Sequence, residues 1–152
     1  MNKTQVLEKI DTTWLELKAA ASGLSNEQMM TPGVTGDWSV KDILGHVSIW
    51  EEESLKYLPL ILRGEQTPRY SKLYGGIDAF NAQMTLQIQQ LSLDEVLARF
   101  DQAHQRLKAF LQGVPEEAFK SDTRFLRRLK YDTYHHYPEH QQAILHWRSQ
   151  LL

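Results

Sequence analysis

Cysteine is absent from this sequence of 152 residues, which excludes disulfides, thiolate metal sites and a cysteine nucleophile. Any thiol chemistry must therefore use a thiol supplied from outside the chain. Long apolar runs are also lacking: no stretch approaches the roughly 18 residues of a membrane span. The N-terminus, MNKTQVLEKIDTTW, becomes charged too early for a signal peptide. We therefore expect a cytoplasmic protein without a membrane partner.

The chain carries little excess charge of either sign. It has 17 basic and 19 acidic residues, with a formal net charge of −2. Because this balance provides no general attraction for phosphates, we expect no nucleic-acid partner. The 41% hydrophobic and 24% charged composition is ordinary for a globular protein. The length suits a single domain over residues 1–152.

Apolar residues recur at spacings of three and four, which is the period of one helix face. Ser39 and Ser92 are each followed by an acidic residue three positions later, a spacing typical of a helix start. No segment alternates as a strand does. These patterns predict an all-α fold, a four-helix bundle with one long crossover and one or two short accessory helices. The apolar marks include Leu7, Ile10, Trp14, Leu17, Ile43, Val47, Trp50, Phe80, Met84, Val96, Phe100, Leu107, Ile144 and Trp147.

Prolines and long polar stretches predict where the helices end. Pro59 is expected to kink or end the second helix, because it lacks an amide donor and crowds the preceding turn. Residues 65–76 form a connection long enough to cross the end of a bundle or to cover a site. Residues 120–131 are polar and basic without a sustained period. The last helix is therefore expected to run from about Thr133 to Leu151.

Histidines are the main candidates for a functional site. His136 and His140 are four residues apart, so on an unbroken helix they share one face. Two such imidazoles can bind one divalent cation, and His46, beside the apolar face of the second helix, is the natural third ligand. The alternative is structural, since histidine pairs at this spacing also occur by chance. His104 and His146 are expected on solvated surfaces.

Two segments resemble the DinB-like superfamily, near its colibactin-resistance-type members. GDWSVKDILGHVSIWEEE is similar to the family's second helix, which carries a metal-ligand histidine. DTYHHYPEHQQAILHW is similar to the final helix, with its H-x-x-x-H pair. The resemblance covers nearly the whole chain and implies a four-helix bundle, often a homodimer, with zinc or nickel held by three histidines. Carried over, these ligands are His46, His136 and His140.

The resemblance also implies chemistry on a small-molecule substrate. Characterised members include transferases that use low-molecular-weight thiols and a mycothiol-dependent isomerase, and a metal suits such reactions because it stabilises a thiolate and polarises an electrophile. We therefore expect a metal-dependent enzyme of the thiol S-transferase or hydrolase type, whose thiol belongs to a cofactor. The alternative is a non-catalytic, small-molecule-binding or stress-protection bundle without metal.

Pro138 lies between the two histidines of the pair and motivates that alternative. If the helix begins before Pro138, the proline kinks the turn that should align the ligands. If Pro138 lies at the first helical position, His136 lies outside the helix and the spacing no longer guarantees a common face.

Charged residues near the histidines have a similar ambiguity. Glu53, Asp132 and Glu139 could orient an imidazole or act as a base, although a solvated helix face is the commoner role. The acidic run at 51–53 is expected to be mostly exposed. A basic stretch could contact an anionic substrate group; it consists of Arg124, Arg127, Arg128 and Lys130.

Overall fold

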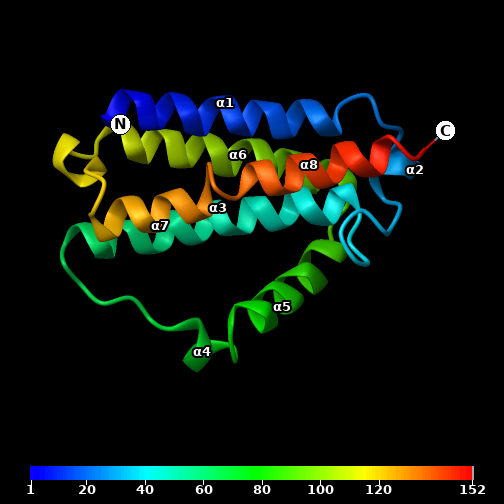
Figure 1. Ribbon diagram of the computed structural model, residues 1–152. Coiled ribbons are helices and arrows are strands. Elements are labelled where there is room, and N and C mark those ends of the chain that lie inside the picture. Colours follow the sequence, from blue (N-terminus) through cyan, green and yellow to red (C-terminus); the bar gives the residue numbers. More distant parts are fainter. Residues whose placement is uncertain (152) are drawn as a thin grey trace.

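The computed structural model describes residues 1–151, which form helices and loops with no β-strand among them. Four long rows of helix lie side by side (Figure 1), which confirms the expected all-α bundle. They are α1 (Lys3–Ala21), α3 (Val40–Leu62), α6 (Leu93–Gln112) and a broken fourth row of α7 (Arg124–Asp132) and α8 (Tyr137–Arg148). The remaining elements are α2 (Asn26–Met29), α4 (Tyr70–Leu73), α5 (Ile77–Gln89) and the 3₁₀ helix η1 (Glu116–Phe119).

The helix starts follow the serines that the sequence indicated. The side chain of Ser39 accepts a hydrogen bond from the amide of Asp42, and the Asp42 carboxylate accepts one from the amide of Ser39. Ser92 and Glu95 form the same reciprocal pair at the start of α6. Such boxes satisfy amides that have no partner within the helix. The box at Ser39 therefore sets the start of α3 and places His46 in its second turn.

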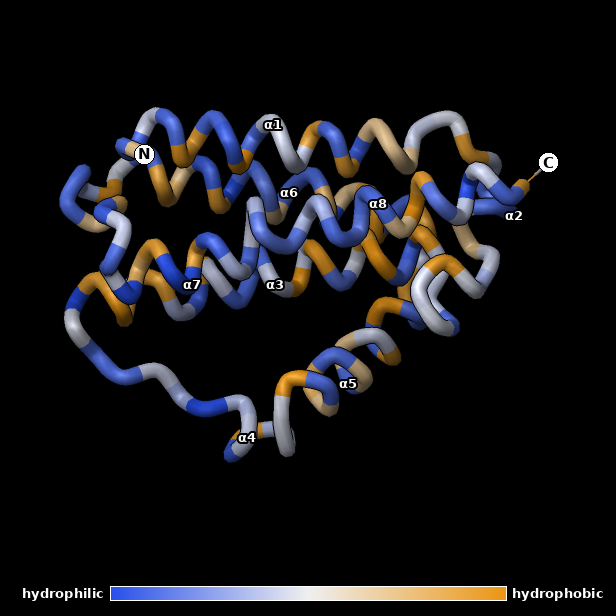
Figure 2. Tube along the Cα trace, in the orientation of Figure 1, coloured by the Kyte–Doolittle hydropathy of each residue, from blue (hydrophilic) through white to orange (hydrophobic). Residues whose placement is uncertain are grey.

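Helix α3 is the centre of the molecule. Every residue from 39 to 51 is buried, because α5, α6, α7 and α8 all pack against α3. Hydrophobic positions face inward along the neighbouring helices, while their outer sides are mostly hydrophilic (Figure 2). A helix buried on all sides also buries its polar residues, and in α3 these include His46, Ser48 and Glu51. Buried polar side chains need partners within the fold, so this helix is where a site is expected.

Gly45 allows α5 to approach α3 closely. A Cβ atom at Gly45 would lie 2.6–2.8 Å from side-chain atoms of Ile88, which is fully buried. From this contact α5 slopes away from the bundle (Figure 1). The contact therefore anchors one end of α5, whose Ile77 and Asn81 line a cavity beside α3.

The fourth row differs from the sequence-based expectation. Residues 120–131 show no sustained period in the sequence, and the last helix was expected to begin only at about Thr133, but α7 covers Arg124–Asp132 and buries Phe125, Leu126 and Leu129. The last helix begins at Tyr137 rather than at Thr133, with Pro138 in its first turn. The prediction was wrong because the many charged side chains of α7 hide a narrow apolar stripe. Pro138 is accommodated because amides in the first turn have no intrahelical partner.

Two other expectations concern α3 and membranes. Pro59 lies inside α3, which continues for three more residues to Leu62. None of the helices in residues 1–151 combines the length and apolar character needed to cross a membrane.

Candidate functional site

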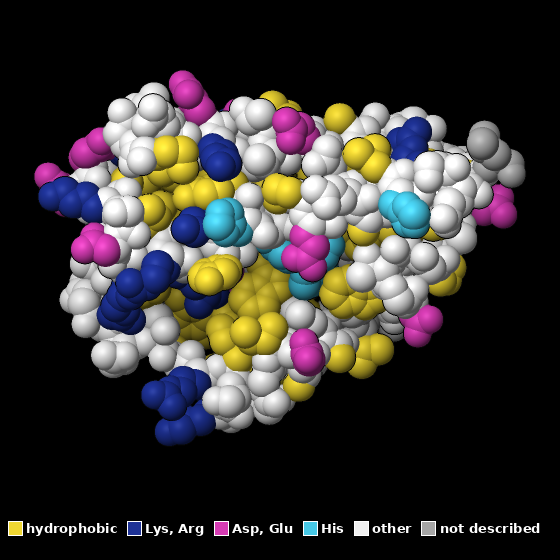
Figure 3. Space-filling view, viewed as in Figure 1, with side chains coloured by type: hydrophobic (Ala, Val, Ile, Leu, Met, Phe, Trp, Pro, Cys, Tyr) yellow, Lys and Arg dark blue, Asp and Glu magenta, His cyan; other side chains and the backbone are white. Residues whose placement is uncertain are grey.

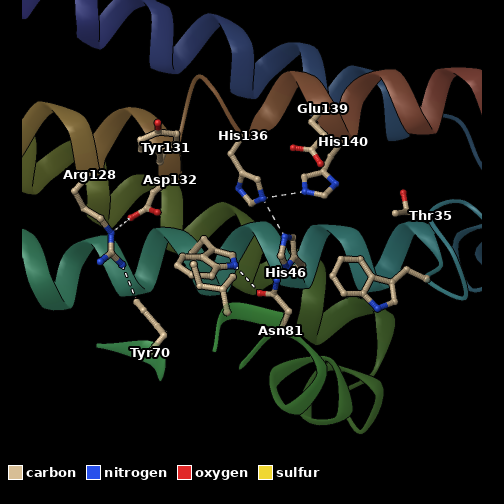
Figure 4. A pocket seen from close by; sticks show the side chains of 13 residues that line it. Thr35, His46, Tyr70, Asn81, Arg128, Tyr131, Asp132, His136, Glu139 and His140 are labelled. Atoms are coloured by element: carbon tan, nitrogen blue, oxygen red, sulfur yellow. Dashed lines mark hydrogen bonds and ion pairs between the residues drawn. The ribbon is translucent and has the colours of Figure 1, made fainter. Parts of the chain in front are cut away.

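The fold brings together the three histidines that the sequence singled out. His46 projects from the second turn of α3, His136 immediately precedes α8, and His140 lies in the first turn of α8 (Figure 4). The Nε2 atom of His136 lies 3.0 Å from Nε2 of His46 and 2.9 Å from Nε2 of His140. One ring nitrogen from each residue falls within 4.8 Å of the others. We call these three residues the histidine cluster.

Pro138 does not prevent this convergence. His136 lies outside α8, yet its backbone keeps helical angles, with φ −107° and ψ −47°. The amides of His136 and Tyr137 both donate to the carbonyl of Thr133, at 2.7 and 2.9 Å. The bend between α7 and α8 is therefore a hydrogen-bonded turn, and it retains the one-turn relation between His136 and His140 that an unbroken helix would give.

The cluster is uncharged near neutral pH. Burial lowers the pKa of His136 to about 4. Burial and repulsion from His136 lower the pKa of His140 to about 3, and burial with repulsion from both neighbouring imidazoles lowers that of His46 to about 2. A neutral imidazole has a lone pair on one ring nitrogen, which is the form that binds metal. The folded chain therefore presents three neutral imidazoles to each other.

The shared contact at His136 fits a cation better than a proton. One hydrogen on Nε2 of His136 can be directed well at only one of its two neighbours, so a single proton leaves the other contact poorly satisfied. In a tetrahedral zinc site with bonds of 2.0–2.1 Å, ligand nitrogens are about 3.3–3.4 Å apart. The separations of 2.9 and 3.0 Å are only a few tenths of an ångström shorter. These two separations therefore fit a divalent cation after a small side-chain adjustment, and the ligand atoms of the remaining pair, His46 and His140, lie within 4.8 Å of each other.

The cluster lies in the wall of a cavity of about 620 Å³, a size typical of small-molecule sites. The cavity appears as a hollow with apolar side chains in its floor and histidine at its edge (Figure 3). The Trp38 ring lies 4.7 Å from the ring of His46, and the Trp50 indole donates to Asn81 of α5 at 2.9 Å. Both tryptophans line the cavity, so the imidazoles face a mostly apolar space.

A second polar group lines the cavity at the C-terminal half of α7. Asp132 is buried and accepts hydrogen bonds at one carboxylate oxygen from Ser54 and Arg128, each at 2.6 Å. The expected solvated role of Asp132 is therefore wrong. Arg128 also donates to the Tyr70 hydroxyl at 2.8 Å, and that hydroxyl donates to Glu53 at 2.9 Å. Tyr70 belongs to the 65–76 connection, so this segment covers the site, one of its two predicted roles.

Glu139 is exposed and lies at the edge of the cavity, as the solvated interpretation predicted. His146 is exposed as well, whereas the prediction for His104 is wrong, since its side chain is fully buried.

The run at 51–53 was expected to be exposed, but Glu51 is fully buried. Its Oε2 atom lies 2.8 Å from Nδ1 of His104 and accepts from the Tyr137 hydroxyl at 3.0 Å. The other ring nitrogen of His104 lies 3.2 Å from Asp11. A sequence signal existed for this histidine, because Phe100 and Leu107 lie one turn before and after it on the buried stripe of α6.

Comparisons with known proteins agree with this fold. The family model of the DinB superfamily matches residues 9–147. No curated protein matches the sequence. Among solved structures, the colibactin self-resistance protein ClbS is similar with a TM-score of 0.82 and 15% identity, over 99% of this chain and 98% of that chain. A Streptococcus pneumoniae protein is similar with a TM-score of 0.82 and 17% identity, over 100% of this chain and 93% of that chain. DfsB, a sibling lethal factor precursor, is similar with a TM-score of 0.81 and 15% identity, over 98% of this chain and 96% of that chain.

One of these structures corrects an expectation from composition. ClbS was crystallised in complex with double-stranded DNA. The exclusion of a nucleic-acid partner on the ground of net charge is therefore wrong for a bundle of this kind. The physical reason is that net charge sums the whole surface, whereas phosphates respond to local groups of basic side chains. Lys and Arg side chains do gather beside the apolar hollow (Figure 3).

Proposed function

Because the chain belongs to the DinB superfamily, we propose that it is a divalent-metal-dependent enzyme of the thiol S-transferase or hydrolase type. Its substrate would be a small molecule bound in the cavity beside the histidine cluster. The observation that carries this proposal is the convergence of three neutral imidazoles at the wall of that cavity. Zinc and nickel both accept imidazole ligands.

His46, His136 and His140 would hold the metal. Three protein ligands are typical of catalytic sites, since they leave a coordination position for water or substrate. When bound, the ion would supply Lewis acidity and stabilise a thiolate or hydroxide. The absence of cysteine is compatible with this chemistry, because a thiol would belong to a low-molecular-weight cofactor.

The chain's own residues would prepare the cavity for such a reaction. Trp38 and Trp50 line the cavity beside the histidine cluster and would keep water away from it. Electrostatic interactions between the cluster and a bound substrate would be stronger as a result. Burial raises the pKa of Asp132, so this carboxyl group is suited to carry a proton within the cavity. Ser54 and Arg128 hold one of its oxygens in place.

Metal analysis of protein purified without a histidine tag tests the proposal. We expect about one zinc or nickel ion per chain, and we expect His140→Ala to lose it. His146→Ala is the matched control, because His146 lies on the same helix but is exposed, and it should retain the metal. Absence of divalent metal, together with no thermal stabilisation by added zinc or nickel, would contradict the proposal. That result would favour a non-catalytic, small-molecule-binding or stress-protection bundle.

Binding to double-stranded DNA is a second candidate function, favoured by the ClbS complex. On this chain Arg124 and Arg127 are exposed on α7, close to the cavity residue Arg128. Gel-shift titration with a DNA duplex at low and moderate salt tests this function. If these arginines contact phosphates, the variant Arg124→Ala/Arg127→Ala should bind more weakly and with a smaller salt dependence. Equal binding by the variant and the parent chain would contradict it.

A further inference from the structure

Arg128 is the positively charged side chain in the lining of the cavity, and the proposed metal site makes no use of it. Figure 4 places it apart from the histidine cluster, on the side of the cavity where Tyr70 and Asp132 lie. Only 17% of its side chain is exposed. A guanidinium that is mostly buried, yet lines a cavity for a small molecule, is expected either to hold neighbouring helices together or to bind a ligand.

The position of the guanidinium is fixed from several sides. Its Cζ atom lies 5.8 Å from the ring centroid of Trp50, 5.4 Å from that of Tyr57 and 5.6 Å from that of Tyr70. Its Nε atom donates to Asp132 and its Nη2 atom donates to the Tyr70 hydroxyl. Because these contacts hold the side chain before any ligand arrives, a ligand would not have to order it.

The same contacts leave donors unused. A guanidinium has five N–H groups, and the hydrogen bonds to Asp132 and Tyr70 use two of them. Within residues 1–151, the hydrogen bonds of Arg128 come from Nε and Nη2, and none comes from Nη1. A planar group with free donors beside an apolar cavity suits a carboxylate, which accepts two parallel hydrogen bonds.

A purely structural role must be weighed, because Asp132 lies beside Arg128 as an ion-pair partner. This pair joins α7 to α3 through Ser54 and to the 65–76 connection through Tyr70. The ion pair uses only the Nε–H group of Arg128, however, and the hydrogen bond to Tyr70 uses one hydrogen of Nη2, so three N–H groups of the guanidinium have no acceptor within residues 1–151. The pair therefore does not remove the attraction of Arg128 for an anion.

We propose that Arg128 binds a carboxylate of the substrate, and that the substrate is a small molecule with an apolar body and one anionic end. The apolar body would lie against Trp50 between Arg128 and the histidine cluster. At the cavity rim, Ile77 and Tyr131 are 54% and 70% exposed, which suits the same kind of body. The reacting end of this substrate rests on the proposed function, whereas the Arg128 end does not require a metal.

The experiment compares two probes of nearly equal shape, 4-phenylbutanoate and its uncharged amide, 4-phenylbutanamide. Binding is followed by the fluorescence of the cavity tryptophans, in protein as purified and in protein treated with EDTA. We expect the carboxylate to bind about tenfold more tightly than the amide in both samples, because charge-assisted hydrogen bonds exceed neutral ones.

Arg128→Met alone would leave Asp132 without its partner and risks unfolding. The test variant is therefore Arg128→Met/Asp132→Asn, which removes both charges and keeps the side-chain volumes. We expect this variant to bind the two probes with nearly equal affinity. Arg127→Met is the matched control, since Arg127 is the exposed neighbour on α7 and does not line the cavity. It should retain the preference for the carboxylate.

Each outcome decides the proposal. Equal affinities in the parent chain, no measurable binding of the carboxylate, or a preference that survives in the double variant would overturn it. A preference that disappears with EDTA while Arg128 is intact means that the metal binds the carboxylate, which also overturns it. A preference that depends on Arg128 supports this inference, and the proposed metal-dependent reaction fails separately only if the purified protein contains no divalent metal and gains no stability from added zinc or nickel.

Discussion

His104 and the histidine cluster both involve α3, and they differ in their partners. His104 has a carboxylate at each ring nitrogen, Glu51 at 2.8 Å and Asp11 at 3.2 Å, and its ring stacks on Trp14 at 4.0 Å. In the histidine cluster, the side-chain hydrogen bonds of the Nε2 atoms join the imidazoles only to one another. Within residues 1–151 the first group is thus satisfied by protein partners and the second is not.

This difference separates a structural histidine from a candidate ligand. A histidine paired with carboxylates on two helices ties those helices together, and His104 connects α6 to α1 and α3. Imidazoles that face one another at the wall of a cavity contribute less attraction of their own, because both contacts of the cluster depend on the single hydrogen or single lone pair at Nε2 of His136. Burial of such a group without a carboxylate is reasonable when a cation binds there.

The largest expected effect is the loss of the structural group. Glu51→Ala removes a buried carboxylate that contacts both His104 and Tyr137, so it should lower the free energy of unfolding by about 3–5 kcal/mol. Glu52→Ala is the control, because Glu52 pairs with Arg99 near the surface and should cost less than about 1 kcal/mol. Urea unfolding measures both. Equal costs for the two variants would contradict the structural role of Glu51.

The histidine cluster should respond to metal instead. Zinc at about 100 to 1,000 times its Kd should raise the free energy of unfolding of the metal-free protein by about 3–4 kcal/mol, since it binds only the folded chain. His136→Ala should abolish this increase, because His136 contacts both other members of the cluster. Thermal unfolding with and without zinc measures it. If zinc raised the free energy of unfolding of the variant as much as that of the parent chain, zinc would have to bind at another site.

A third side of α3 sharpens the comparison, because Gly45 positions α5 and with it the cavity wall. Gly45→Ala should cost about 1–3 kcal/mol, since the new methyl group would overlap the buried Ile88 side chain. Gly113→Ala is the control, because its nearest contact lies at 3.8 Å and its φ of −88° suits any residue. Denaturant unfolding should show a much smaller change there. Full stability of Gly45→Ala would mean that α5 is less tightly packed than described.

The last expected effect is a pH dependence of the cluster. In the folded chain the pKa values of His46, His140 and His136 are lowered to about 2, 3 and 4, whereas the unfolded chain takes up protons near the ordinary value of about 6.5. The stabilising contribution of these neutral imidazoles is therefore complete above pH 6.5 and is lost as the pH falls toward 4.

Each imidazole should lower the free energy of unfolding by up to about 1.4 kcal/mol per pH unit in that window. Thermal unfolding of metal-free protein at pH 7, 6 and 5 measures the slope. His140→Ala should show a shallower slope than the parent chain. An unchanged slope in that variant would show that other groups cause the acid sensitivity.

Much of this molecule could be predicted from local patterns. The serine caps at residues 39 and 92 and the apolar stripes locate most helices, because both signals act over one or two turns. The same logic failed at α7, whose apolar stripe is narrow, and at Glu51 and His104. A polar residue on a helix buried on all sides has no local signature, because its burial depends on which helices pack around it.

The sequence by itself determined the helical class, the capped starts of the helices and the residue types that could bind a metal. Tertiary structure decided which of those residues meet. His46 and His136, which are 90 positions apart in the chain, lie in contact. Pro138 lies in the first turn of α8, and Arg128 lies in the wall of a cavity. The physical reason is that a helix depends on neighbours within four residues, whereas a site depends on the packing of helices that are distant in the chain.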